Sequence, residues 1–252
     1  MEINFDKTSS VTEKLFLAAL MAMGAGIDQE ELNDKDYVLS HVVPFAHPAE
    51  KDLDTALTIE DANLLGIKFA FGFSKEILGG ALAVSLLKEK AIKELDITLI
   101  ELVQAAERNI HPMIRTRLFS EIPGIKEIIE LTKTLQQAGV LSTDKGPEMP
   151  LCSITVGRRV AGGALLDPLL PALIKEKLNT DSFYVLPVSV HELVAVPAYY
   201  IKAPEDVRHI QETVAHINKT VVLPDNKEDY LSDNVFLYNG RSFSTILNFP
   251  AE

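Results

Sequence analysis

The sequence contains one cysteine, Cys152, in 252 residues. A single thiol cannot close an intramolecular disulfide, and it cannot supply the several thiolates of a structural zinc site. The segment from Met1 to Lys14 is polar, and it lacks the basic region followed by an apolar run that marks a secretory signal peptide. We therefore expect a cytoplasmic protein.

Basic residues are scarce relative to acidic ones. Lys and Arg number 24 against 36 Asp and Glu, which gives a formal net charge of -12. This charge repels phosphate backbones and anionic lipid headgroups, so we expect neither nucleic acid nor a membrane as partner. Ten of the acidic residues lie between Asp28 and Asp61, without the alternating spacing of a calcium loop. We interpret this stretch as a solvated surface.

Long apolar runs are also missing. The run from Ala81 to Leu87 is flanked by charged residues and is far shorter than the roughly 20 residues that span a bilayer. The chain is 47% hydrophobic and 24% charged, which is typical of a globular protein. We predict that this run forms part of a buried core helix.

Helix signals dominate residues 1–140. Capping pairs stand three residues apart at Ser10 and Glu13, at Thr58 and Asp61, and at Thr98 and Glu101. We predict helices from Ser9 to Gly24, through most of 58–95, from Thr98 to Asn109, and from about Ile125 to Ala138. We therefore predict that the first 140 residues form a mainly helical region.

Residues 142–150 are rich in turn-forming residues and mark the best boundary in the chain. Beyond it we predict strands at 151–156, 183–186, 190–196, 234–238 and 242–247, with helices at 167–178 and from 204 onward. Asn239 and Gly240 favour a type I′ hairpin turn. The fold class is α+β: residues 150–252 form a mostly antiparallel sheet domain of β-α-β-β-α-β-β order, which suggests two helices on one face of the sheet. The sequence leaves open whether residues 1–140 and residues 150–252 are separate domains or pack as one unit.

Several residues suggest chemistry without completing a known motif. His191 and Glu192 begin like a zincin motif, but Ala195 stands where its second histidine is needed, so we expect no metal. Ser189 and His191 would lie on the same side of a strand, where their side chains can touch. This arrangement is compatible with a hydrolase that uses the two residues. No G-x-S-x-G motif accompanies them.

Cys152 and the glycine-rich segment 157–163 are weaker candidates. Cys152 could act as a nucleophile with His191 as its base, but its place in an apolar strand favours a buried core residue. The glycine-rich segment lacks the Lys and Ser or Thr of a phosphate loop, so we expect no nucleotide cofactor. Its Arg158 and Arg159 could hold a carboxylate or a phosphate.

Three segments together resemble a known family. Residues 154–164 (ITVGRRVAGGA), 184–193 (YVLPVSVHEL) and 231–235 (LSDNV) are similar to the uncharacterised bacterial family called domain of unknown function 5688. The resemblance spans Leu95 to Tyr238, and the His-Glu segment is its specific part. It implies a shared fold and candidate positions, with no assigned reaction, and Cys152 is not among its characteristic residues.

We therefore predict a non-catalytic cytosolic binding or regulatory module for an unknown small molecule or protein. The candidate ligand-binding residues are Ser189, His191, Glu192, Thr155, Arg158 and Asp233. Three alternatives stay open. The first is a hydrolase that uses Ser189 and His191. The second is a structural or assembly protein, for example a homodimer joined through a sheet edge. In the third, the cluster around His191 only ties the turn at Pro187 to an adjacent strand.

Overall fold

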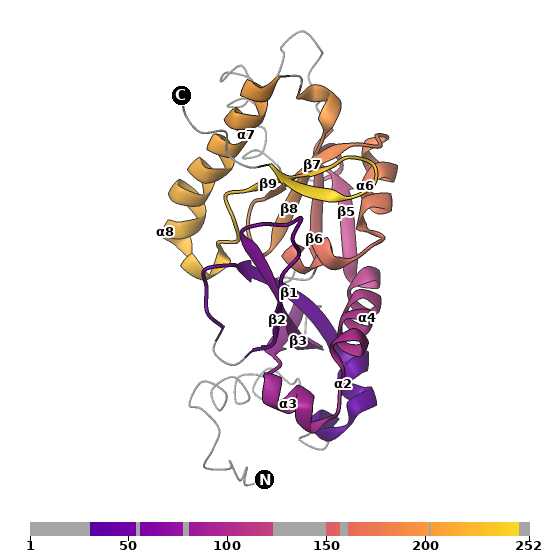
Figure 1. Cartoon of the computed structure of the whole chain (residues 1–252). Coiled ribbons are helices and arrows are strands. Elements are labelled where there is room, and N and C mark those ends of the chain that lie inside the picture. Colours follow the sequence, from indigo (N-terminus) through magenta and orange to yellow (C-terminus); the bar gives the residue numbers. More distant parts are fainter. Residues whose placement is uncertain are drawn as a thin grey trace.

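A computed structural model describes residues 31–53, 56–77, 81–122, 150–156, 161–201 and 203–246 (Figure 1). The helices predicted from Ser9 and from about Ile125 lie outside these residues, and so does Arg158. In the part of the chain that is described, no helix is both long and apolar enough to cross a membrane.

The first half of the chain forms a four-stranded antiparallel sheet with helices against it. Strand β3 is central, with β1 on one side and β2 and β4 on the other. The elements of this part are η1 (Glu31–Asn33), α2 (Lys35–His41), β1 (Val42–Pro48), β2 (Thr58–Ile59), β3 (Ile67–Ile77), β4 (Ala81–Leu86), α3 (Glu89–Glu94) and α4 (Leu99–Ile110).

The predicted helix through residues 58–95 is therefore wrong over most of its length, and so is the mainly helical description of the region. Thr58 lies in β2, and Asp61 accepts a hydrogen bond from the Asn63 backbone instead of capping a helix. In β3, large apolar residues at 67, 69, 71 and 73 alternate with smaller or polar ones. Because Ala70 and Gly72 are apolar too, the alternation looks like a continuous apolar run.

The capping box predicted at the start of α4 is confirmed. Thr98 Oγ1 accepts the backbone N–H of Glu101 at 3.2 Å, and Glu101 Oε2 accepts that of Thr98 at 2.8 Å. Lys35 lies 2.9 Å from the Glu101 carboxylate, and Lys35 followed by Thr98 lowers the pKa of Glu101 to about 2. The sequence marks this helix start correctly because the signal is local.

The second half of the chain forms a six-stranded antiparallel sheet in the order β10-β9-β7-β8-β6-β5. Its elements are η2 (His111–Met113), β5 (Ile114–Leu118), η3 (Phe119–Glu121), β6 (Cys152–Val156), η4 (Ala161–Leu166), α6 (Leu170–Leu178), β7 (Phe183–Pro187), β8 (Glu192–Pro197), η5 (Ala198–Tyr200), α7 (Pro204–Ile217), η6 (Asn218–Val222), α8 (Leu223–Asp225), η7 (Lys227–Asp229), β9 (Val235–Tyr238) and β10 (Phe243–Ile246).

Every strand and long helix predicted after residue 150 has a counterpart here, and the chain is α+β with antiparallel sheets. The sheet is not confined to residues 150–252, however, because its edge strand β5 comes from the region before residue 140.

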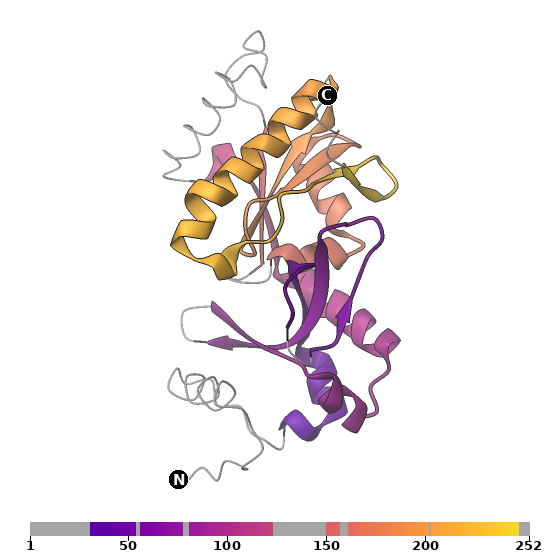
Figure 2. The ribbon, with the colours of Figure 1, turned by 60° about the vertical axis from the view of Figure 1, so that its left-hand side comes forward.

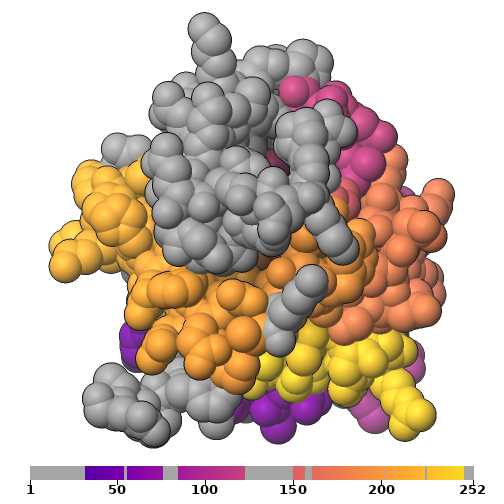
Figure 3. Space-filling model, turned by 90° about the horizontal axis from the view of Figure 1, so that it is seen from above, coloured from indigo at the N-terminus to yellow at the C-terminus, as the bar shows by residue number. Residues whose placement is uncertain are grey.

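The two long helices cover opposite faces of the larger sheet (Figures 1 and 2). Leu193 and Ala195 of β8 pack into a core with α6 and η4, whereas Val194 and Val196 pack with α7. The expected placement of both helices on one face is therefore wrong. Figure 3 shows the end of the molecule where the β9–β10 hairpin (yellow) lies at the surface beside the start of α7 (orange).

The β9–β10 hairpin is confirmed, but its turn is not type I′. Tyr238 pairs with Phe243, which leaves a four-residue loop of residues 239–242. A type I′ turn needs positive φ at both central residues, and here Gly240 has φ 92° while Asn239 does not. Asn239 Oδ1 instead accepts the backbone N–H groups of Arg241 and Ser242.

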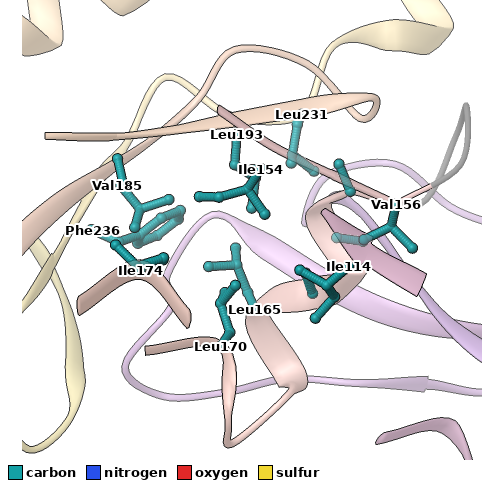
Figure 4. Packing of buried hydrophobic residues seen from close by; sticks show 14 of the residues in the cluster. Ile114, Ile154, Val156, Leu165, Leu170, Ile174, Val185, Leu193, Leu231 and Phe236 are labelled. Atoms are coloured by element: carbon teal, nitrogen blue, oxygen red, sulfur yellow. The ribbon is translucent and has the colours of Figure 1, made fainter. Parts of the chain in front are cut away.

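The two sheets share one core, in which η4 lies directly against β1. Val43, Ala46 and Phe69 of the smaller sheet pack in the same cluster as the larger-sheet residues shown in Figure 4. A Cβ atom on Gly163 would stand 2.0 Å from the Pro44 carbonyl oxygen, and one on Gly162 would stand 2.8 Å from both Ala46 and Leu231. Gly162 and Gly163 of the supposed phosphate loop thus permit close packing between backbones.

We predict that Gly163→Ala lowers the free energy of unfolding by about 3 kcal/mol or more, or prevents folding, because the obstructing Pro44 carbonyl belongs to the backbone and cannot rotate away. Gly240→Ala is the control: it meets no atom closer than 3.4 Å and should cost about 1 kcal/mol for its positive φ. Urea unfolding measures both. Equal decreases of the free energy of unfolding in the two variants would contradict the close approach of η4 to β1.

Candidate functional site

The turn between β7 and β8 holds two of the predicted site residues, Ser189 and His191. The Ser189 backbone N–H donates to the Glu192 carbonyl at 3.1 Å, and Ser189 Oγ accepts the His191 backbone N–H at 3.1 Å. Since β8 begins only at Glu192, Ser189 and His191 are not on a strand, and the argument that placed them on one side of it is wrong. The Ser189 hydroxyl oxygen thus accepts a hydrogen bond within its own turn.

The His191 ring joins this turn to η7. His191 Nε2 lies 2.9 Å from Asp229 Oδ1, which also accepts the Asn226 side-chain amide at 3.0 Å. The Val190 backbone N–H donates to the Asp229 carbonyl at 2.9 Å. Because a carboxylate only accepts, Nε2 carries the ring hydrogen in the neutral form, and Nδ1 becomes the acceptor. Nδ1 is buried and has no hydrogen-bond partner among the described residues.

Glu192 and Thr155 stand next to each other on adjacent strands. They are register partners of β8 and β6, and Thr155 is in turn the partner of Arg115 on β5. Directly opposed residues of an antiparallel sheet share a face, so these three form a polar row across the sheet. Ser153 Oγ donates to Glu192 Oε1 at 2.5 Å and fixes the carboxylate.

Asp233 belongs to a different group of contacts. Its Oδ1 accepts the Asn218 side-chain amide at 2.7 Å, and Asn218 is almost fully buried. Burial, followed by the charges of Asp233 and Glu50, raises the pKa of Tyr230 to about 12. Among the residues that the structure describes, no hydrogen bond or ion pair joins Asp233 to the turn at Ser189. The structure therefore gathers Ser189, His191, Glu192 and Thr155 around the start of β8.

Cys152 is fully buried in the core, as the sequence predicts. Burial raises the pKa of its thiol to about 12, so the thiolate needed for attack is not formed near neutral pH. The nucleophile hypothesis for Cys152 is wrong.

Two residues of this site escape prediction from the sequence. Asp229 follows a charged stretch and Ser153 lies in a short apolar strand, and neither carries a local motif. Each reaches its partner through pairing between distant segments, which the spacing along the chain does not reveal. Within the described ranges, no group of three or more His, Cys, Asp and Glu residues is arranged to hold a metal ion.

Comparison with known proteins gives one match. A model of the Family of unknown function (DUF5688) matches residues 57–240. The chain belongs to this family. The match begins upstream of Leu95, where the resemblance starts, and it includes the smaller sheet from β2 onward. Neither a curated protein nor a solved structure matches the chain.

We predict that Cys152 does not react with 5,5′-dithiobis(2-nitrobenzoate) at pH 8 in the native protein, because its thiol is buried and its pKa stands at about 12. The same thiol should react stoichiometrically in denaturing urea. Absorbance at the thionitrobenzoate maximum measures both reactions. Rapid reaction of the native protein would contradict the buried position.

We expect His191→Ala to lower the free energy of unfolding by about 1–3 kcal/mol, because the variant removes one hydrogen-bond partner of Asp229 and loosens the turn. His209→Ala is the control: it is exposed on α7 and lies 3.4 Å from Glu212, and its change should stay within about 0.5 kcal/mol. Thermal unfolding compares the two. An unchanged His191→Ala stability would contradict a structural role for the ring.

Proposed function

We propose that this protein is a binding module whose ligand site lies at the start of β8, and that this site carries out no chemistry. The observation that supports the proposal is the Glu192 carboxylate, which is held by Ser153 while the residue remains partly exposed. A carboxylate fixed on a sheet is a preformed hydrogen-bond acceptor.

The chemistry of the site favours a cationic ligand group. Glu192 and Thr155 offer acceptor oxygens, and Asp229, which holds the adjacent His191, offers a second partly exposed carboxylate. The Arg115 guanidinium is turned back onto the carbonyls of Pro112 and Ile114 at 2.7 and 3.0 Å. With a net charge of -12, the chain attracts cations over a distance. An amine or guanidinium, on a small molecule or a protein, is therefore the proposed ligand group.

The hydrolase alternative receives less support. A serine nucleophile needs a hydrogen bond to its base, but Ser189 Oγ contacts the His191 backbone, and the His191 ring contacts Asp229. Assembly through a sheet edge is also less favoured. The edge strand β5 presents exposed Arg115 and Arg117, and charged residues of this kind discourage pairing with another strand.

Two further features belong to the proposal. We place the protein in the cytoplasm, on the basis of its single cysteine. We also propose that the regions before and after residue 150 fold as one unit, because both contribute to the same core cluster.

Binding of spermidine, a polyamine, tests whether the ligand group is cationic. We expect millimolar spermidine to raise the melting temperature of the wild-type protein, as any ligand of the native state does. Glu192→Gln keeps the shape of the side chain and should weaken spermidine affinity about tenfold or more in calorimetry, because it removes a charged acceptor. Glu212→Gln, on the exposed face of α7, controls for the general charge effect. Equal affinities of the two variants, or no binding by the wild type, would overturn the proposal.

A further inference from the structure

A second histidine lies against a carboxylate at a place that the sequence patterns do not single out. His111 follows the last residue of α4, and Asp167 follows the last residue of η4. His111 Nδ1 and Asp167 Oδ2 are 2.7 Å apart. The Asp167 side chain is only 2% exposed, whereas the His111 side chain is 37% exposed. A buried acid thus meets a ring that faces solvent.

The contacts of Asp167 fix its orientation. Its Oδ1 accepts the Leu169 backbone N–H at 3.0 Å, and its own backbone N–H donates to the Ala164 carbonyl at 2.9 Å. Asp167 therefore holds the turn before α6 with one oxygen and His111 with the other.

These contacts determine which ring nitrogen of His111 carries the hydrogen. Asp167 as a carboxylate can only accept, so Nδ1 of the neutral ring is the donor and Nε2 holds a lone pair. Nε2 makes no hydrogen bond to the residues that the structure describes. A ring in this state is a proton acceptor in a fixed orientation.

The surroundings add a second titratable group. Glu107 lies one helical turn before His111 on α4, and residues four apart are neighbours on a helix surface. Burial and then the charge of Asp167 raise the pKa of Glu107, while Arg108 lowers it. Among the described residues, Asp167, Glu107 and Arg108 are therefore charged groups close to His111.

We propose that His111 and Asp167 form a second functional site, in which His111 acts as a general base toward a hydroxyl group of water or of a bound alcohol. The O–H bond breaks, the proton forms a bond with Nε2, and the electron pair stays on the oxygen. Asp167 stabilises the resulting imidazolium. The two neighbouring carboxyl groups favour a substrate that is neutral or cationic at this point.

This proposal goes beyond the binding site at the start of β8, because it uses none of its residues. An ion pair that only stabilised the fold would need no accessible lone pair on the ring. The His191 pair shows the contrast, since there the ring nitrogen opposite the carboxylate is buried.

Reactivity with diethyl pyrocarbonate tests the orientation of the ring. The reagent attacks an unprotonated imidazole nitrogen, and mass spectrometry of peptides gives a rate for each histidine. His209 is the matched control, because its side chain is 41% exposed and its partner Glu212 lies at 3.4 Å. We expect His111 to react about tenfold faster than His209 at pH 7, which equals the lower end of the effect that a carboxylate partner has on a metal-ligating histidine.

Asp167→Asn should remove the difference in reaction rate between His111 and His209. The amide can donate to Nδ1, which moves the ring hydrogen to Nε2 and eliminates the lone pair there. Should this variant fail to fold, the nitrogen chemical shifts of His111 in the wild-type protein at pH 8 identify the tautomer directly. Equal rates for His111 and His209, or a hydrogen on Nε2 in the wild type, would overturn the proposal.

Hydrolysis of 4-nitrophenyl acetate tests the activation of water. We expect His111→Gln to slow hydrolysis by the protein about a hundredfold or more, the lower end of typical general-base contributions. His209→Gln should leave the rate unchanged, and neither variant changes a residue of the spermidine site. Equal rates for His111→Gln and the wild type would refute a role of His111 as base.

Discussion

Backbone contact between η4 and β1 joins the two sheets into one structure. The contact requires glycine at 162 and 163, because Pro44, Ala46 and Leu231 occupy the space that side chains would need. Through it, residues of the smaller sheet enter the core of the larger one. Since Asp167 follows the last residue of η4, the same contact also determines where Asp167 meets the end of α4.

Both histidine–carboxylate pairs lie near one end of the larger sheet. Strand β5 begins opposite Val156, where β6 ends, and β8 begins at Glu192 opposite Thr155. His111 precedes β5 and His191 precedes β8, so both rings stand just before strand starts at this end. The two side chains are similarly exposed, at 32% for His191 and 37% for His111, and the pairs differ in that Nδ1 of His191 is buried.

The sequence predicts a structural feature correctly where residues close together along the chain determine that feature. The capping box at Thr98 is of this kind, and the burial of Cys152 follows from its apolar strand. Strand β3 is missed because its small residues, including Gly72, are apolar and conceal the alternation of its phenylalanines. The partners of His191 and His111 are missed for another reason. Asp229 and Asp167 come from distant segments, and only the packing of sheets and turns brings them to the rings.

The origin of β5 has a consequence for how the chain can be divided. The turn-rich residues 142–150 invite a fragment that begins at residue 150, yet such a fragment would lack β5 (Ile114–Leu118). Strand β6 would then become an open edge, with the N–H and C=O groups that pair with β5 left without partners. It would also lose Ile114 from the core. A shortened version that stays soluble must therefore begin before α4, so that the helix, His111 and the edge strand remain together.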